Sequence, residues 1–327
     1  MVRVDVIVPV FNTKMEYLLE AIDGLRKQTL TDWAAWIVDD GSDEAYGNQL
    51  RSLLTSYDDV RFNHLYTQHK GATGSRNVAI KQGCAPYIAL LDSDDFWLPE
   101  HLAQMVVYLD RDEKISLAHG HYQIIDSQGL PLDTASPIPG LNELDVSQTF
   151  ARMLKGNFIG ASTVVVRREL VSQVDGFDAS LQSLGDKDLW LRLLSVGAKF
   201  HYIPEVSVHY RVHPGNVSHK TDLLLATRHR IIEKAAALIR ENELFTKLDW
   251  PAIKAEMTRH MYREATEVHF SQGRFALALR YGVPWNSGIS IRLCSILVRS
   301  AFRILVAPVA SLFHYSTSSA NSRTGKR

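Results

Sequence analysis

The sequence predicts an α/β protein built on a doubly wound, mostly parallel sheet, with further helices after the sheet. Apolar, β-branched runs such as Val2–Val10 alternate with segments that carry apolar residues at helical spacing. Such runs are typical of strands buried on both faces of a parallel sheet, and the alternation is typical of βαβ units. Acidic clusters directly follow two of the runs. Sheets of this class bind ligands at those strand ends.

The elements of the first half follow one another closely. Asn12 or Thr13 is expected to cap a helix over Met15–Leu25, whose apolar residues recur at helical spacing. A helix that stops near Gly83 and another that begins at Pro99 fit the positions these residue types favour. Further strands are expected at Trp33–Val38, Val60–Leu65 and Tyr87–Leu91.

The pattern changes after residue 110. Strands are predicted at Ile115–Ile125 and Ser162–Val166, and a helix at Asp186–Val196. Residues 126–146 are rich in proline, glycine and hydroxyl side chains and predict a loop over the site. Residues 222–283 have helical spacing.

Composition argues against several classes of function. Lys plus Arg (36) balances Asp plus Glu (36), so no bulk positive charge indicates nucleic-acid binding. Cys84 and Cys294 are far apart and fit neither a disulfide nor a metal motif, so we expect a reducing compartment. The N-terminus starts a strand at once and shows no signal-peptide pattern. A cytoplasmic location is therefore expected.

The strongest motif is Asp92-Ser93-Asp94-Asp95, directly after a predicted strand. Neighbouring carboxylates repel one another unless a cation lies between them. Hard divalent ions take oxygen ligands and often share the site with substrate phosphates. A solvated acidic turn before a helix is the other interpretation, and the motif alone leaves both open.

Asp39 and Asp40 form the second acidic cluster. A carboxylate at a strand end can accept hydrogen bonds from a nucleobase or a ribose hydroxyl, although a plain Asp-Gly turn is the simpler interpretation. Phe11, just past the first strand, can lie flat against a base or be an ordinary core aromatic.

Two cations and a glycine follow the third predicted strand. Lys70 and Arg76 can neutralise a diphosphate, and Gly71 allows close backbone approach. The segment lacks the Gly-Lys-Ser/Thr ending of a P-loop, and the chain contains no G-x-G-x-x-G fingerprint. Neither P-loop ATP binding nor NAD binding is therefore indicated.

Three later side chains are candidates for catalysis or metal binding. Asp186 is either the N-cap of a helix or a base that takes a proton from an acceptor hydroxyl, and Asp188 lies just inside the same helix. His213 carries an imidazole suited to a manganese-type ion, although a lone histidine is more often structural.

The ordered set of motifs resembles family 2 glycosyltransferases of the GT-A fold. The set runs V-I-V-P-V-F-N, V-D-D-G-S-D, G-x-x-x-x-R-N, L-D-S-D-D, D-x-D-L-W-L-R and Y-R-V-H-P-G-N, within residues 2–218. The resemblance implies an inverting enzyme that moves one sugar from a nucleotide-diphosphate sugar, with a UDP-sugar as the first expectation. The implied acceptor is a glycan or lipid-linked hydroxyl in cell-envelope polysaccharide or glycolipid assembly. The Q-x-x-R-W motif of processive members is absent from the sequence.

The resemblance also implies the donor contacts. Phe11 and Asp40 match positions that hold the nucleotide base, and Asp92 matches the ribose contact. Beside the diphosphate and the sugar, the matching residues are Lys70, Gly71 and Arg76. The remaining residues predicted to contact the donor are Pro9, Asn12, Asp39 and Ser93.

The resemblance also implies the metal ligands and the catalytic base. Asp94, with Asp95 beside it, matches the metal-binding end of the D-x-D motif, and His213 lies where some members place a metal ligand or a phosphate contact. The implied cofactor is Mn²⁺ or Mg²⁺. Asp186 matches the usual catalytic base. Gly185 stands where Glu is frequent, which keeps Asp188 as an alternative base.

The implied organisation is a catalytic domain over residues 1–218, with a nucleotide-binding half to residue 110 and an acceptor half from residue 111. A helical extension (219–287), an amphipathic segment (288–314) and a polar, disordered tail (315–327) follow. A non-catalytic protein that binds nucleotide-sugar or glycan is one alternative. The other is a nucleotidyltransferase, which usually carries a Gly-rich basic loop where this chain has Pro9-Val10-Phe11-Asn12.

Residues 288–314 are apolar enough to raise the question of a membrane span. On a helix of about 100° per residue, Arg292, Arg299 and Arg303 fall in one stripe about 40° wide. Burying an arginine near the bilayer centre costs about 2.5–3.5 kcal/mol, whereas each apolar residue returns only about 0.3–0.6 kcal/mol. We therefore expect peripheral contact with the membrane surface; a helix docked on the protein's own core is the alternative.

The 327-residue chain should accordingly float with anionic liposomes at low salt, because the arginine stripe would lie among anionic headgroups. A chain that ends near Pro284 should stay at the bottom of the gradient. Recovery of both chains in the bottom fraction would contradict the surface helix.

Overall fold

The computed structural model describes residues 1–134, 138–216 and 221–271. The chain forms two compact units, Met1–Arg259 and His260–Arg327. Within the second unit, the described residues belong to the end of α9 (Trp250–Ser271). The predicted amphipathic segment, the polar tail and the last part of the helical extension lie outside the described residues.

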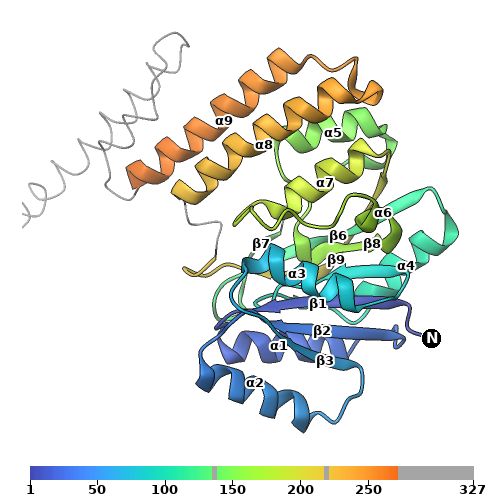
Figure 1. The fold of residues 1–327 in the computed structure, drawn as a ribbon, viewed down its shortest axis with the longest axis vertical. Coiled ribbons are helices and arrows are strands. Elements are labelled where there is room, and N and C mark those ends of the chain that lie inside the picture. The colour runs from blue at the N-terminus through green and yellow to red at the C-terminus, as the bar shows by residue number, and fades with distance from the viewer. Residues whose placement is uncertain (135–137, 217–220, 272–327) are drawn as a thin grey trace, which may run out of the picture. The chain divides into compact units, whose positions relative to one another are not determined.

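A twisted sheet forms the centre of the first unit (Figure 1). Its first half is parallel, in the order β3-β2-β1-β4, and consists of β1 (Val4–Val10), β2 (Trp33–Asp39), β3 (Phe62–Tyr66) and β4 (Tyr87–Leu90). All four strands therefore end at the same edge.

The second half of the sheet joins through antiparallel pairing of β8 (Val164–Arg167) with β4. The order continues β8-β6-β9-β5, with β6 (Ile115–Ile125), β9 (Lys199–Arg211) and β5 (Phe96–Trp97). β6 and β9 are parallel, and β7 (Pro131–Thr134) pairs antiparallel with β6. The predicted doubly wound, mostly parallel α/β fold is confirmed, with these antiparallel strands added.

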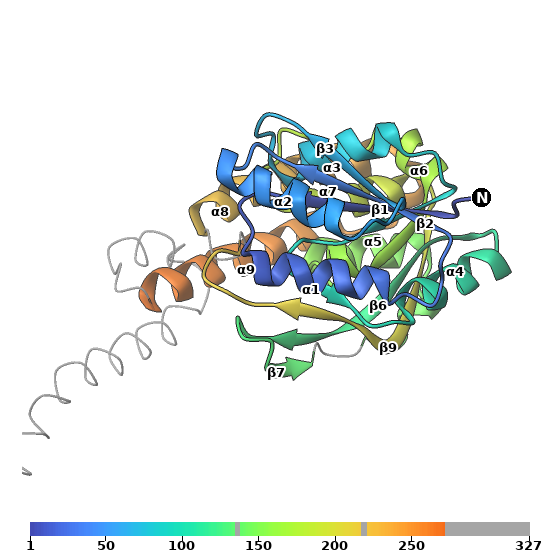
Figure 2. The same ribbon diagram turned by 90° about the horizontal axis from the view of Figure 1, so that it is seen from below.

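Helices cover both faces of the sheet (Figures 1 and 2). Alternation along β1 explains why: Val4, Val6 and Val8 face one apolar cluster and Ile7 faces the other. The first cluster is closed by α1 (Met15–Arg26), α2 (Glu44–Ser56) and α4 (His101–Arg111). The second is closed by α3 (Gly71–Gln82), α5 (Val146–Lys155), α6 (Arg168–Gln173), α7 (Gly185–Ser195) and α8 (Thr221–Glu241).

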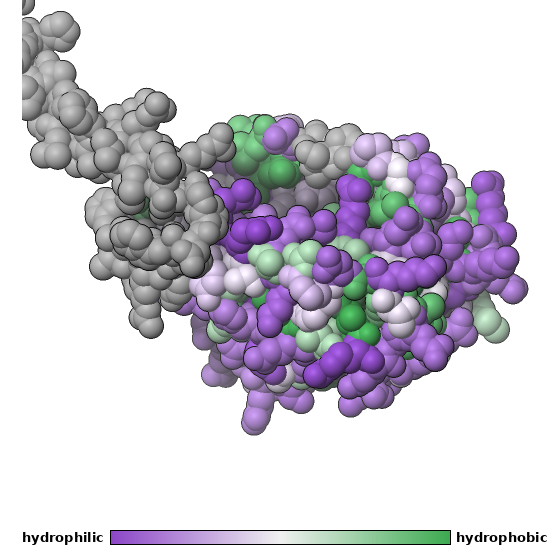
Figure 3. Space-filling model, turned by 90° about the horizontal axis from the view of Figure 1, so that it is seen from above, coloured by the Kyte–Doolittle hydropathy of each residue, from purple (hydrophilic) through white to green (hydrophobic). Residues whose placement is uncertain are grey.

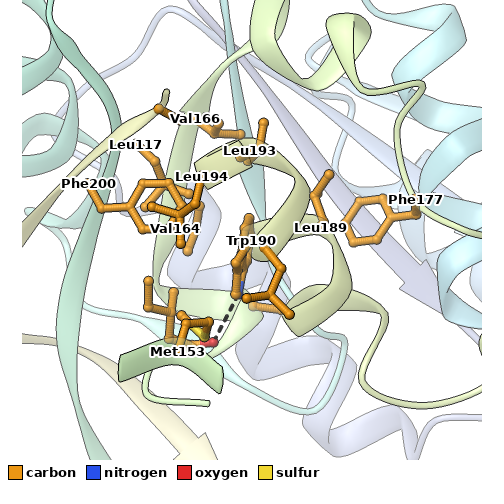
Figure 4. Packing of buried hydrophobic residues seen from close by; sticks show 14 of the residues in the cluster. Leu117, Met153, Val164, Val166, Phe177, Leu189, Trp190, Leu193, Leu194 and Phe200 are labelled. Atoms are coloured by element: carbon orange, nitrogen blue, oxygen red, sulfur yellow. Dashed lines mark hydrogen bonds between the residues drawn. The ribbon is translucent and has the colours of Figure 1, made fainter. Parts of the chain in front are cut away.

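Trp190 fixes the position of α7 within the second cluster (Figure 4). Its fully buried indole lies among Met153, Leu193 and other apolar side chains. The indole Nε1–H donates to the carbonyl oxygen of Ile159, 3.3 Å away. Because Trp190 lies one turn after Asp186, this anchor also sets where Asp186 points.

Three sequence predictions about local structure were wrong. Neither Asn12 nor Thr13 caps α1, which begins after Lys14 without a side-chain cap. The helix predicted from Pro99 begins at His101, because the short strand β5 precedes it. The predicted loop at 126–146 contains β7 and a short 3₁₀ helix at Leu141–Glu143.

Polar residues dominate the face shown in Figure 3, where apolar side chains of the described residues form small, separate patches. Such a surface is typical of a solvated protein face. Within the described ranges, we find no helix with both the length and the apolar character of a membrane span.

A buried ion pair connects β1 to α6 and should carry much of the stability of the parallel half. Asp5 accepts from Arg168 Nη2 (2.5 Å), from Trp36 Nε1 (2.8 Å) and from the backbone N–H of Ala85 (2.7 Å). We expect Asp5→Ala to lower the free energy of unfolding by about 3–5 kcal/mol, because it leaves a largely buried guanidinium unpaired. Urea denaturation would measure this change.

Asp110→Ala is the matched control, since its pair with Arg3 is about one-third exposed. That substitution should cost less than about 1 kcal/mol. Equal losses in the two variants would refute a special contribution from the buried pair.

Candidate active site

The loops that follow β1, β2 and β4 are tied together by short hydrogen bonds. The backbone N–H of Asn12 donates to Ser42 Oγ (3.0 Å), and Asn12 Oδ1 accepts from the N–H of Asp43 (3.1 Å). Thr13 Oγ1 and Ser93 Oγ are 2.7 Å apart. Asn12 and Ser93, both predicted to contact the donor, therefore also hold the loops of the site to one another.

Asp39 and Asp40 are both buried and both organise backbone. Asp39 Oδ1 accepts from the N–H of Ser42 at 2.9 Å. The two carboxylate oxygens of Asp40 accept from the N–H groups of Lys70 and Gly71, each at 2.8 Å. Asp40 thus holds the first turn of α3. Gly71 has a φ of +74° and open space where a side chain would be, so its backbone is accessible.

Phe11 presents an aromatic ring at the surface of this loop cluster. Its side chain is 47% exposed, and its ring stacks on His69 with centroids 4.1 Å apart. His69 Nδ1 in turn lies 2.9 Å from Asp40 Oδ2. Pro9 lies buried inside β1 in register with Val38, and its contact with the donor stays a prediction.

Asp92 brings three distant parts of the chain together. It pairs with Arg76, whose buried guanidinium also lies over the ring of Phe177. Burial raises the pKa of the Asp92 carboxyl, Arg76 lowers it, and the charges of Asp94 and Asp186 raise it further. Asp186 therefore lies close to the acidic cluster, although it is far from it in sequence. Arg76 was predicted from the sequence to lie beside the diphosphate. In the structure, its guanidinium pairs with the carboxylate of Asp92.

Asp94 and Asp95 point in opposite directions. Asp94 Oδ2 lies 2.9 Å from Nε2 of His213, and both side chains are partly exposed. Asp95 is buried and accepts from Ser162 Oγ (2.6 Å) and the backbone N–H of Arg211 (2.9 Å). Burial raises the pKa of the Asp95 carboxyl well above its usual value. Both oxygens of Asp95 are engaged by these donors, and its role as a metal ligand stays a prediction.

Arg211 is the residue that sequence reasoning missed. It is fully buried, yet its guanidinium donates to the carbonyl oxygen of Asp94 (2.9 Å) and to the carboxylate of Glu20 (2.5 Å). The group also lies over the ring of Tyr17, 4.4 Å from its centroid. Its position in the motif Y-R-V-H-P-G-N was the only sequence feature that indicated a role for this arginine. Arg211 fixes the turn that exposes Asp94.

His213 is held by its own turn. The N–H of Gly215 donates to Nδ1 of the ring (3.1 Å), and the N–H of His213 donates to Asn216 Oδ1 (2.6 Å). With Nδ1 accepting, Nε2 carries the ring proton and donates to Asp94. His213 is therefore a hydrogen-bond donor in this arrangement, and Nε2 would bind a metal only after losing that proton.

The acidic cluster fits a divalent ion that takes few protein ligands. Among residues 1–134, 138–216 and 221–271, no three His, Cys, Asp or Glu side chains gather in a metal-binding group. Mg²⁺-type ions are commonly held by one or two carboxylates together with substrate phosphates and water. Asp94, partly exposed between Asp92 and His213, suits that mode.

Asp186 lies in the first turn of α7 and is half-buried. Asn157 Nδ2 donates to its Oδ2 at 2.8 Å, and its Oδ1 has no hydrogen-bond partner in the described part of the chain. The N-cap of α7 is Leu184, so the capping interpretation of Asp186 was wrong. The carboxylate keeps one oxygen available beside Asp92.

Asp188 is buried and forms ion pairs with Arg192 (2.8 Å) and Lys234. Two cations therefore surround this carboxylate on the side of α7 that meets α8. Asp188 is engaged in these ion pairs, and its role as the alternative base stays a prediction.

A family described as "Glycosyl transferase family 2" matches residues 5–174, which contain both acidic clusters. This match spans more than half of the chain. The chain belongs to glycosyl transferase family 2.

Several curated proteins are similar over 58–66% of this chain. WfgD of Escherichia coli, a UDP-Glc:alpha-D-GlcNAc-diphosphoundecaprenol beta-1,3-glucosyltransferase, is 31% identical over 58% of this chain and 69% of its own. WfaP of the same organism, described in the same words, is 29% identical over 66% of this chain and 79% of its own. An uncharacterized glycosyltransferase of Rickettsia felis is 27% identical, and the match spans 35% of that longer protein.

Solved structures share the GT-A fold. S. aureus TarS in complex with UDP-GlcNAc has a TM-score of 0.61 at 17% identity, over 82% of this chain and 73% of TarS. The mannosyltransferase PcManGT from Pyrobaculum calidifontis, in complex with GDP-Man and Mn²⁺, has a TM-score of 0.60 at 16% identity, over 95% and 82%. At such identities the likeness shows the fold of this glycosyl transferase family 2 member.

Asp94→Ala should abolish Mn²⁺-dependent binding of UDP, because the diphosphate would then face Asp92 without a bridging cation. Isothermal titration of UDP with and without Mn²⁺ would test this. Asp112→Ala is the control, because Asp112 lies in the turn before β6, at the end of that strand away from the site. This variant should bind UDP as the native chain does. Unchanged affinity and unchanged metal dependence in Asp94→Ala would remove Asp94 from the metal site.

Proposed function

We propose that this protein is an inverting glycosyltransferase that adds a single sugar from a UDP-sugar to a hydroxyl of a lipid-linked glycan. One observation carries the proposal: the half-buried carboxylate of Asp186 lies near enough to Asp92 to raise its pKa. A proton acceptor and the donor-side carboxylates thus share one site at the carboxyl edge of the strands.

The names of the relatives support the choice of donor and acceptor. WfgD and WfaP are both described as using UDP-Glc and a diphosphoundecaprenol-linked GlcNAc. TarS has been solved in complex with UDP and with UDP-GlcNAc. We therefore propose a role in cell-envelope polysaccharide assembly, at the cytoplasmic face of the membrane.

The donor would lie across the loop cluster. Phe11 offers an exposed ring to the nucleobase, and Asp92 is the proposed ribose contact. Lys70 is exposed beside the open backbone of Gly71, where a diphosphate oxygen can approach. A Mn²⁺ or Mg²⁺ ion bound at Asp94 would offset the negative charge that develops on the leaving nucleoside diphosphate.

Transfer would then proceed by direct displacement. Asp186 takes the proton from the acceptor hydroxyl as its oxygen attacks the anomeric carbon from the face opposite the diphosphate. The bond to the diphosphate breaks as the new glycosidic bond forms, so the anomeric configuration inverts. No covalent enzyme intermediate is needed.

Thermal shift with a panel of nucleotide-sugars, with and without Mn²⁺, tests the donor. A true ligand at about 100 times its dissociation constant adds about 2.7 kcal/mol of stability. Transfer to α-D-GlcNAc diphosphoundecaprenol tests the acceptor. Stabilisation by a donor without turnover on any acceptor would favour a non-catalytic binding protein.

Asp186→Asn should reduce turnover by about 10²–10⁴-fold while UDP binding survives, because the amide keeps the size of the side chain and loses the proton acceptor. Steady-state kinetics and calorimetry together measure both effects. Asp188→Asn is the comparison: it should lower stability, with the remaining folded fraction keeping its turnover number. A large loss of turnover in Asp188→Asn alone would reverse the assignment.

A further inference from the structure

A side chain from outside the acidic motifs contacts the proposed base. Asn157 lies in the exposed segment between α5 and β8, and its Nδ2 donates to Asp186 Oδ2 at 2.8 Å. Building on the proposed function, we infer that Asn157 is a positioning residue, which fixes one oxygen of Asp186 so that the other meets the acceptor hydroxyl.

The orientation of the Asn157 amide is set by its second contact. Its Oδ1 accepts from the backbone N–H of Ile159 at 3.4 Å. With the oxygen turned to Ile159, the NH₂ group is directed to Asp186. The amide can therefore donate to the carboxylate and cannot compete with it for a proton.

The segment that carries Asn157 is itself attached to α7. The carbonyl of Ile159 accepts from the buried Trp190 indole at 3.3 Å (Figure 4), and the carbonyl of Leu154 accepts from Lys187 Nζ at 3.0 Å. Asp186 and Trp190 of α7 thus contact the segment itself, and Lys187 contacts the last turn of α5 directly before it. The distance between Asn157 and Asp186 is held by this attachment.

The hydrogen bond makes the two carboxylate oxygens of Asp186 different from each other. Oδ2 is engaged by Asn157, and Oδ1 has no partner among the residues that the structure describes. A carboxylate in the first turn of a helix can otherwise rotate freely about its terminal torsion. Restricting that rotation keeps Oδ1 directed at the reacting hydroxyl, which is the contribution that orientation makes to catalysis.

Kinetics of Asn157 variants test the inference, with UDP-glucose and α-D-GlcNAc diphosphoundecaprenol as the first substrate pair. Asn157→Ala removes the donor, and Asn157→Asp removes it while keeping the shape. Both should lower kcat by about 10- to 100-fold, with KM for each substrate within about twofold of the native value. UDP binding with Mn²⁺ should be unchanged, which also shows that the variants fold.

Lys187→Met is the matched control. It removes a neighbouring contact of α7, with the Leu154 carbonyl in the last turn of α5, but leaves the Asn157–Asp186 bond in place. Native-like kcat in this variant supports a specific role for Asn157. A loss as large as that of Asn157→Ala, or a loss confined to KM, would overturn the inference and assign the bond to loop stability or acceptor binding.

Asp186→Asn is measured in the same series, because it distinguishes an error in the role of Asn157 from an error in the proposed base. If Asp186→Asn is inactive and both Asn157 variants turn over at the native rate, Asp186 is still the base and only the positioning role is refuted. If Asp186→Asn retains native turnover, the proposed base itself is wrong, and the role of Asn157 falls with it.

Discussion

The buried carboxylate of Asp95 is the contact on which the geometry of the acidic cluster depends. It accepts hydrogen bonds from the hydroxyl of Ser162 and from the backbone N–H of Arg211, two residues that come from different parts of the second half of the sheet. Burying such a group is costly unless its oxygens are satisfied, and here both are. Along this turn, Ser93 and Asp95 are buried, whereas Asp92 and Asp94 are partly exposed. Asp92 and Asp94 consequently face the site.

Arg211 completes this arrangement from the other side of the turn. Its guanidinium donates to the carbonyl of Asp94 and pairs with Glu20 on α1. Its buried positive charge is balanced by the Glu20 carboxylate, and its remaining contacts are with the carbonyl oxygens of Asp94 and Asp126. The end of β9, the turn after β4 and helix α1 are thus joined through one side chain. The site exists because the two halves of the sheet meet there.

The sequence predicted the strands well and the individual side chains less well. Long apolar runs such as the one in β1 identify buried strands, because both faces of a central strand must be apolar. The turn residues were harder to assign, since Asp39, Asp40 and Asp95 are all carboxylates at strand ends. All three are buried in the structure, and the donors to Asp40 and Asp95 come from elsewhere in the chain. The partners of Asp95, Ser162 and Arg211, are far away in sequence, so no local pattern reveals them.

The sequence also left open which of Asp186 and Asp188 is the base, and helix geometry narrows that choice. Two positions apart on a helix means about 200° of rotation, so only one of the two carboxylates can face a given site. The choice is made by α8, whose Lys234 pairs with both Asp188 and Asp178. That helix lies after residue 174, where the family match ends. By engaging Asp188 on one side of α7, α8 turns Asp186 toward Asn157 and Asp92 on the other. The helical segment after the sheet is therefore part of what orients the site, and its removal would release α7 from the side opposite the acidic cluster.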